Sequence, residues 1–135
     1  MVNRMGQSRM EATHVNMSVL VVEDESVARH ALDKLLRRSG FDTTSVGSGE
    51  EALRFLNQHE GPHVALIDLD LPGMNGAELL KRLHELRPDT HAVIMTATSA
   101  ERVRELINDE HIPHLRKPLD FRTLLRLLSQ ELRPN

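Results

Sequence analysis

The segment VALIDLDLPGMNG, residues 64–76, decides the fold of this chain. It begins as an unbroken apolar run, which is typical of a strand buried on both faces of a parallel sheet. The run ends at Asp68, and the PGMNG sequence that follows predicts a turn. In open α/β sheets, the carboxyl end of a buried strand is where ligands bind. Because burying a lone carboxylate is costly, we expect a cation beside Asp68.

The segments on either side alternate between two periodicities. Continuous apolar or β-branched runs predict strands, and apolar residues spaced three and four apart predict helices. The expected strands are residues 18–22, 42–46, 63–68, 91–95 and 112–115. A helix is expected after each strand. The core-facing stripe of the first helix includes Val27, Ala31 and Leu35, and that of the fourth, expected from about Ser99 to Asp109, includes Leu106.

The five strand–helix alternations, joined by short connections, indicate the fold class. They predict an α/β domain, a doubly wound five-stranded parallel sheet with five helices on its two faces. Residues 1–17 show neither periodicity, so we expect a flexible N-terminal leader there and a folded domain over residues 18–135.

Composition excludes several classes of function. The chain has 135 residues, a formal net charge of −3 and no basic block, which argues against direct binding of nucleic acid. It has no cysteine, and no apolar run approaches the length of a membrane span or a signal peptide. We therefore expect a cytoplasmic protein without membrane contact.

Residues with reactive side chains follow four of the five strands. Because parallel strands share one carboxyl edge, we expect Glu23, Asp24, Asp68, Thr96 and Lys117 to converge there. Carboxylates that converge repel one another unless a cation lies between them, and Mg²⁺ suits oxygen ligands of this kind. Such a set could bind and transfer a phosphoryl group, with Asp68 as the nucleophile.

Four motifs occur in an order and spacing that resemble a known family. They are VLVVEDE (19–25), LIDLDLPGMNG (66–76), IMTA (94–97) and RKP (116–118). From about residue 18 to residue 132 the chain resembles the receiver domain of two-component response regulators. The resemblance implies a flavodoxin-like sheet with strand order 2-1-3-4-5.

The resemblance also implies a reaction. Asp68 would be the phosphoacceptor, attacking the phosphohistidine of a partner histidine kinase or histidine phosphotransfer protein. Glu23, Asp24, Asp68 and the backbone carbonyl of Asp70 would hold Mg²⁺ or Mn²⁺. The domain would assist its own phosphorylation and dephosphorylation and would not be an enzyme that acts on a separate substrate.

A switch is implied as well. Thr96 and Lys117 would contact the phosphoryl group, and the Lys117–Pro118 peptide bond would be cis. Movement of Thr96 would reshape the face formed by the fourth helix, fifth strand and fifth helix. That face would bind a downstream protein or an attached output domain, and a homodimer through it is left open.

Two positions depart from the family pattern or vary within it. His114 stands where the family usually has Tyr or Phe, so it is either an inert exposed residue or a group that makes switching pH-sensitive. Asp70 places an acid two residues after the phosphoacceptor. Its side chain either points to solvent above the site or, with Thr98 nearby, tunes the lifetime of phosphorylated Asp68.

Three other classes remain as alternatives. A Mg²⁺-dependent phosphatase or phosphotransferase with an aspartate nucleophile would fit the Asp68-Leu69-Asp70 spacing, but its nucleophile would normally follow the first strand. A flavin-binding domain would need a phosphate-cradling loop after the first strand, and this sequence has no hydroxyl- or glycine-rich loop there. A receiver-like scaffold that works without phosphorylation would not need all five site residues, and their presence in this sequence argues against that class. The chain is interpreted either as a stand-alone regulator or as a piece of a hybrid kinase or longer regulator.

Overall fold

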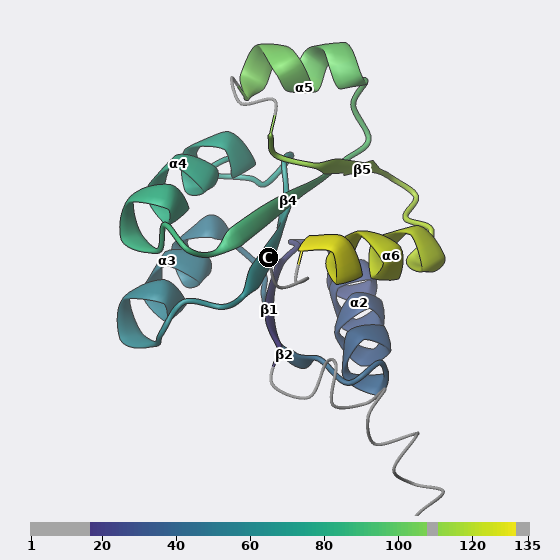
Figure 1. The fold of residues 1–135 in the computed structure, drawn as a ribbon. Helices are drawn as coiled ribbons and strands as arrows, with labels where there is room; N and C mark the ends of the chain where they lie inside the picture. The colour runs from purple at the N-terminus through teal and green to yellow at the C-terminus, as the bar shows by residue number, and fades with distance from the viewer. Residues whose placement is uncertain (1–16, 108–110, 132–135) are drawn as a thin grey trace, which may run out of the picture.

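The central element of the structure is a five-stranded parallel sheet in the order β2-β1-β3-β4-β5, which confirms the predicted flavodoxin-like order (Figure 1). The structure, a computed structural model, describes residues 17–107 and 111–131. The strands are β1 (Ser18–Val22), β2 (Asp42–Val46), β3 (Val64–Asp68), β4 (His91–Thr96) and β5 (His114–Arg116).

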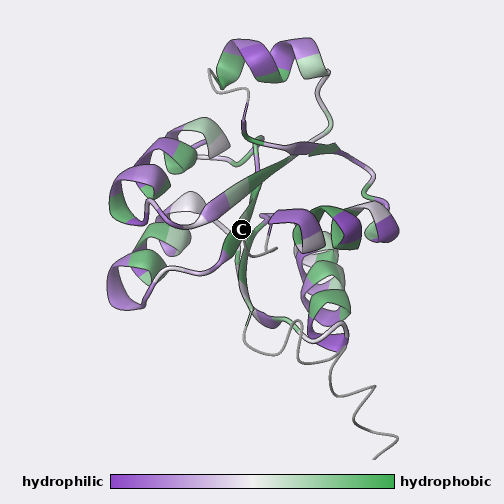
Figure 2. Ribbon diagram, viewed as in Figure 1, coloured by the Kyte–Doolittle hydropathy of each residue, from purple (hydrophilic) through white to green (hydrophobic). Residues whose placement is uncertain are grey.

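Helices cover both faces of this sheet. Figure 1 shows α3 and α4 on one face and α2 and α6 on the other, with α5 near β5. Their bounds are α2 (Ser26–Arg38), α3 (Gly49–Gln58), α4 (Gly76–Leu86), α5 (Ala100–Leu106) and α6 (Phe121–Glu131). Figure 2 shows hydrophobic and hydrophilic residues alternating along the helices, as expected for elements with one face against a sheet.

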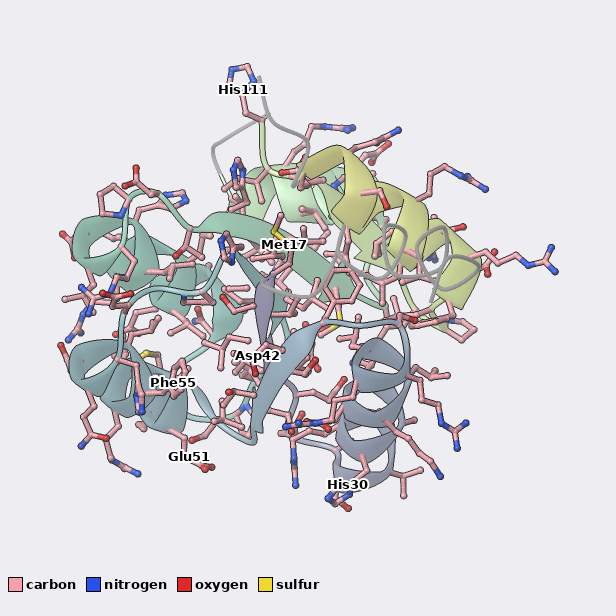
Figure 3. The ribbon with its side chains drawn as sticks, turned by 60° about the horizontal axis from the view of Figure 1, so that its bottom comes forward. Met17, His30, Asp42, Glu51, Phe55 and His111 are labelled. Atoms are coloured by element: carbon pink, nitrogen blue, oxygen red, sulfur yellow. The ribbon has the colours of Figure 1, made fainter. Side chains whose placement is uncertain are left out.

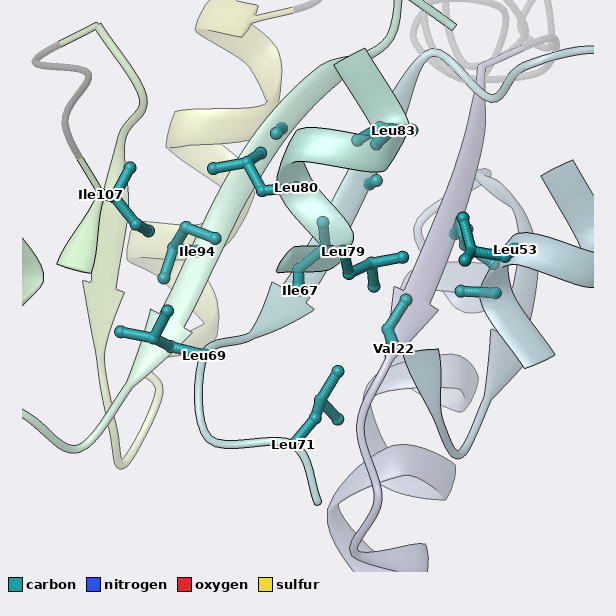
Figure 4. Close-up of a cluster of buried hydrophobic side chains, with 14 of the residues drawn as sticks. Val22, Leu53, Ile67, Leu69, Leu71, Leu79, Leu80, Leu83, Ile94 and Ile107 are labelled. Atoms are coloured by element: carbon teal, nitrogen blue, oxygen red, sulfur yellow. The ribbon is translucent and has the colours of Figure 1, made fainter. Parts of the chain in front are cut away.

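Two hydrophobic clusters fill the space between the sheet and its helices. The cluster under α3 and α4 includes Ile67, Leu79 and Leu83, and Ile107 joins it from the end of α5 (Figure 4). The opposite cluster lies under α2 and α6. Because β1 and β3 contribute to both clusters, nearly every residue of these two strands is buried. This explains their unbroken apolar runs.

The strand register brings the candidate residues to one edge. β1 pairs with β3 so that Val22 lies beside Ile67, and β3 pairs with β4 so that Asp68 lies beside Met95. The carboxyl ends of β1, β3, β4 and β5 therefore lie along the same edge of the sheet. The helix that follows β1 is capped there, because the Glu25 side chain accepts a hydrogen bond from Ala28 N.

Four residues predicted to face the core are exposed: Val27, Ala31 and Leu35 in α2, and Leu106 in α5. The side chain of Val27 is 77% exposed and that of Leu106 is 42% exposed. Val27 lies in the first turn of α2, beyond the carboxyl edge of the sheet. Leu106 is the last residue of α5, after which the backbone of Ile107 is extended. The predicted helix end at Asp109 lies outside the described residues.

The fifth strand is displaced by two residues from its predicted start. It begins at His114, immediately after Pro113, whose carbonyl accepts a hydrogen bond from Ile94 N. Proline has no N–H to donate, which limits how it extends a ladder. As an edge strand of three residues, β5 is only partly buried.

The predicted leader is described only at its last residue. Residues 1–16 lie outside the described part, whereas Met17 packs against the cluster under α2 and α6. Met17 O also accepts a hydrogen bond from Asp42 N at 2.9 Å. Figure 3 shows Met17 and Asp42 on neighbouring segments. None of the helices described within residues 17–107 and 111–131 is long and apolar enough to cross a membrane.

Candidate functional site

Three carboxylates form an acidic cluster at the carboxyl edge of the sheet. Glu23 and Asp24 follow β1, and Asp68 is the last residue of β3. One oxygen from each of these side chains lies within 4.8 Å of the other two. Glu23 and Asp68 are almost fully buried, whereas Asp24 is exposed. The Glu23 backbone N–H donates to Val46 O at 3.1 Å, which fixes the start of this loop against the end of β2.

Lys117 is the cation expected beside Asp68. Its Nζ donates to Asp68 Oδ2 at 2.8 Å and to Glu23 Oε1 at 2.7 Å. The backbone N–H of Lys117 donates to Thr96 O at 2.8 Å, which anchors the lysine at the end of β4. The Lys117–Pro118 peptide bond is cis. One ammonium thus bridges carboxylates that come from two different loops.

Burial and pairing shift the pKa values of this bridge. Burial, which disfavours the charged form, raises the pKa of Glu23, although the hydrogen bonds from Lys117 and from Glu25 N partly offset this effect. For Lys117, burial alone would lower the pKa, but the hydrogen bonds to Asp68 and Glu23 outweigh it and raise the pKa above its usual value. The lysine is therefore held in its charged form.

The loop after β3 holds the second oxygen of Asp68. Asp68 Oδ1 accepts a hydrogen bond from Asp70 N at 2.9 Å, so both oxygens of the carboxylate have donors. Gly76 packs directly under this loop. A Cβ on Gly76 would lie 2.5 Å from Asp68 O and 2.6 Å from Leu69 Cα, so only glycine fits. Gly73 in the same loop has φ of +71°, a left-handed conformation that favours glycine.

A cavity of about 520 Å³ opens onto this edge. Its polar end is lined by five predicted site residues, namely Glu23, Asp24, Asp68, Asp70 and Lys117. Its remaining walls are largely apolar and come from α2 and from the loop that leads into α6. They include Ala31 and Leu35 on one side and Leu119 and Phe121 on the other.

Thr96, Thr98 and His114 lie outside the lining of this cavity. Thr96 is fully buried at the end of β4, and its Oγ1 accepts a hydrogen bond from Thr98 N at 2.9 Å. His114 is exposed and pairs in register with Ile94. Because paired residues of parallel strands point to the same face, His114 lies on the side of the sheet that α5 covers.

One residue with a clear role in this geometry was not predicted from the sequence. Arg29 Nη1 donates to Glu23 O at 2.9 Å and to Asp24 O at 3.3 Å. The available signal was its position one turn into the helix that follows the acidic pair, outside the apolar stripe. That signal is weak, because backbone carbonyls as partners leave no trace in the sequence.

The chain belongs to the family described as "Response regulator receiver domain", which its sequence matches over residues 19–129. It is a receiver domain of the two-component type, and the phosphatase alternative is not favoured. The family fits the observed strand order and the acidic edge of the sheet.

Curated relatives differ in how much of their length the chain spans. It is 30% identical to sporulation initiation phosphotransferase F of Bacillus subtilis over 108 residues, covering 79% of this chain and 86% of the relative. It is 36% identical to the sensory transduction protein RegX3 of Mycolicibacterium smegmatis, covering 86% of this chain but 50% of the relative. For a cyclic di-GMP phosphodiesterase of Thermotoga maritima the identity is 30%, and the chain spans 31% of the relative's length.

Solved structures share the fold. A CheY-like receiver domain protein from Methanospirillum hungatei superposes with a TM-score of 0.80 at 24% identity, covering 87% of this chain and 94% of that one. The receiver domain of Francisella response regulator 1452 superposes with a TM-score of 0.77 at 28% identity, covering 87% and 97% of the two chains.

Proposed function

We propose that Asp68 accepts a phosphoryl group from the phosphohistidine of a histidine kinase or histidine phosphotransfer protein. The observation that carries this proposal is a buried carboxylate, oriented by Lys117 and Asp70 N, that faces an open cavity. In the transfer, an Asp68 oxygen forms a bond to phosphorus. The phosphorus–nitrogen bond breaks, and its electron pair stays on the leaving imidazole. The charged Lys117 ammonium stabilises the negative charge of the phosphoryl oxygens.

The donor set fits a hard divalent cation. Three carboxylates lie close together, and Lys117 supplies a single positive charge against them. The remaining negative charge is one that a divalent cation would balance. We propose that Glu23, Asp24, Asp68 and the backbone carbonyl of Asp70 hold Mg²⁺ or Mn²⁺. When bound, this ion neutralises phosphoryl oxygens that the lysine alone does not reach.

The apolar walls of the cavity suggest how the partner docks. Val27, Ala31 and Leu35 recur every four residues along α2 and are exposed, so they form a stripe beside the acidic cluster. Leu119 and Phe121 face this groove from the other side. We propose that the helix bearing the partner's histidine packs along this stripe, because in-line attack requires the histidine to lie directly above Asp68.

The output of the domain is proposed to lie on the face formed by α5, β5 and α6. Phosphorylated Asp68 would draw the Thr96 hydroxyl away from Thr98 N, its present partner, and shift the packing of this face. A downstream protein or an attached output domain would bind there. We propose that the domain spans residues 18–135, that residues 1–17 form a leader, and that the protein works in the cytoplasm. It would act on no separate substrate.

Mass spectrometry of the intact protein tests the central step. After incubation with acetyl phosphate and Mg²⁺, we expect a single phosphoryl adduct on the wild-type chain. Asp68→Asn, which keeps the shape of the acceptor, should give none. Asp24→Asn should reduce the yield, because it removes a metal ligand without touching the nucleophile. An adduct of equal yield on Asp68→Asn, or no adduct on folded wild-type protein, would contradict the proposal.

A further inference from the structure

Arg29 contacts the main chain of the loop that carries Glu23 and Asp24. Its guanidinium reaches back from the first turns of α2 to the carbonyl oxygens of Glu23 and Asp24, at 2.9 and 3.3 Å. No ion pair joins Arg29 to a carboxylate among the described residues. The arginine therefore fixes the backbone of the two residues and leaves their side chains free to bind.

A second loop also approaches Nη1 of the guanidinium. Gly47, in the loop between β2 and α3, faces Arg29 so closely that a Cβ would lie 3.1 Å from Nη1. The same loop is tied to the site by the hydrogen bond from Glu23 N to Val46 O. Arg29 thus occupies a slot between the loop of Glu23 and Asp24 and the loop after β2, and this slot restricts where the guanidinium can go.

We propose that Arg29 is a positioning residue for the metal site: by holding the carbonyls of Glu23 and Asp24, it sets the direction of both carboxylates toward Asp68. This inference rests on the proposed function, because it assumes that these carboxylates bind a divalent ion. Two neighbouring carbonyls on one nitrogen fix the rotation of the loop better than a single contact would. The positive charge also lies behind the three carboxylates, where it reduces their mutual repulsion without competing for their oxygens.

The planar shape of the guanidinium should matter for holding this loop, as well as its positive charge. A guanidinium is planar and presents several donors in a fixed arrangement, whereas an ammonium is a compact point charge on a flexible stem. Lysine at this position would keep the charge behind the cluster but would not hold the two carbonyls in the same way. Arg29→Lys and Arg29→Gln therefore separate the contribution of charge from that of geometry.

The test is the dissociation constant of Mg²⁺, measured by isothermal titration calorimetry without any phosphodonor. Arg29→Gln should weaken binding by about 10- to 100-fold, the usual effect of removing a group that orients metal ligands. Arg29→Lys should fall between Arg29→Gln and the wild type. The matched control is Arg37→Gln on the same helix, because Arg37 also donates to a backbone carbonyl, that of Thr43, away from the site. Arg37→Gln should bind Mg²⁺ like the wild type.

Unfolding by urea, followed by circular dichroism, ensures that affinities are compared only between folded proteins. If Arg29→Gln does not fold, Gly47→Ala takes its place, because it keeps Arg29 but displaces its Nη1. It should weaken Mg²⁺ binding several-fold. Unchanged affinity in the folded Arg29 variant, or in Gly47→Ala where that variant replaces it, would overturn the inference. Equal weakening in Arg37→Gln would overturn it too. A wild-type chain that binds no Mg²⁺ would instead refute the proposed function.

Discussion

Lys117 and Asp68 are 49 positions apart in the sequence, yet Lys117 Nζ lies 2.8 Å from Asp68 Oδ2. The contact forms because β3 and β5 are parallel and flank β4, so the residues at their carboxyl ends meet. The same ammonium contacts Glu23, which follows β1. The fold thus brings Asp68, the proposed phosphoacceptor, and the Lys117 cation together from the ends of different strands, and one ammonium does not balance the charge of the three carboxylates.

Replacing Lys117 by glutamine should destabilise the metal-free protein. Asp68 and Glu23 would then be buried without a cation, and we expect a loss of about 1–3 kcal/mol in the free energy of unfolding. Urea denaturation followed by circular dichroism measures this loss. Mg²⁺ should recover part of it, because a ligand that binds only the folded state stabilises that state. Lys117→Arg, which keeps the charge, should lose less, and equal losses in the two variants would contradict this account.

Replacing Glu23 by glutamine should have the opposite effect on stability. Because burial raises the pKa of Glu23 in the folded protein, folding favours the protonated form. The contribution of this carboxyl to stability is therefore largest below its unfolded pKa of 4.5 and falls as the pH rises through the folded value. Without Mg²⁺ at neutral pH, Glu23→Gln should be more stable than the wild type by about 1 kcal/mol.

The pH dependence of this difference is its control. The gain from Glu23→Gln should shrink as the pH is lowered toward the unfolded pKa, where the wild-type carboxyl also becomes neutral. The variant should also gain less stability from Mg²⁺, because it has lost one of the proposed metal ligands. A gain that stayed constant with pH would show that the buried charge is not its cause.

The sequence predicted most of this fold because its central strands, β1, β3 and β4, contain short, continuous apolar runs. β1 and β3 lie against helices on both faces, so their runs have no polar interruptions that would make them ambiguous. The convergence of Glu23, Asp68 and Lys117 also followed from the sequence, because strand direction alone brings the carboxyl ends together. Topology and periodicity were sufficient for these features.

Other features could not be predicted, for physical reasons. Helical periodicity shows which side of a helix is apolar, but not where the sheet beneath it ends or how much of a broad apolar side the sheet covers. Val27, Ala31, Leu35 and Leu106 were therefore wrongly assigned to the core. β5 is a half-buried edge strand, and its hydrophobic pattern is correspondingly weak. Arg29 acts on main-chain carbonyls, which every residue possesses.

Asp70 should influence the lifetime of phosphorylated Asp68. Its side chain lines the cavity, and its backbone N–H holds Asp68 Oδ1 at 2.9 Å. Asp70→Asn keeps that backbone contact but removes a negative charge beside the phosphoryl group, so we expect the rate of autodephosphorylation to change several-fold. The loss of the phosphoryl adduct over time, followed by intact mass, gives this rate. Thr98→Ala tests the neighbouring position, and unchanged half-lives in both variants would contradict the proposed tuning.

His114 should make the switch sensitive to pH. It stands on the α5-facing side of β5, exposed and in register with Ile94. A charged imidazole resists movement into an apolar slot more than a neutral one does, so we compare the switch at about pH 5.5 and at about pH 8. Amide chemical shifts of the phosphorylated protein should therefore differ between these conditions around α5 and β5. His114→Phe should abolish the difference, and identical wild-type shifts at both pH values would refute the idea.

Among the glycines within residues 17–107 and 111–131, Gly76 should be the least tolerant of alanine. It is the first residue of α4, and its Cβ would lie 2.5 Å from Asp68 O and 2.6 Å from Leu69 Cα. Both atoms belong to the main chain of Asp68 and Leu69, so they cannot swing aside as a flexible side chain would. We expect Gly76→Ala to cost about 1–3 kcal/mol in the free energy of unfolding and to slow phosphorylation, because relief of the clash must displace Asp68.

Gly49→Ala is the matched control for this substitution. Gly49 is likewise the first residue of its helix, α3, but its Cβ would approach Met74 no closer than 3.2 Å, and two of the three nearest atoms belong to the flexible methionine side chain. The Gly49→Ala protein should therefore be destabilised less than the Gly76→Ala protein, and it should accept a phosphoryl group at the wild-type rate. Urea denaturation and the rate of adduct formation from acetyl phosphate measure both effects. If the two glycines responded alike, the tight packing beneath Asp68 would have no special role, and the turn after β3 would serve only to connect it to α4.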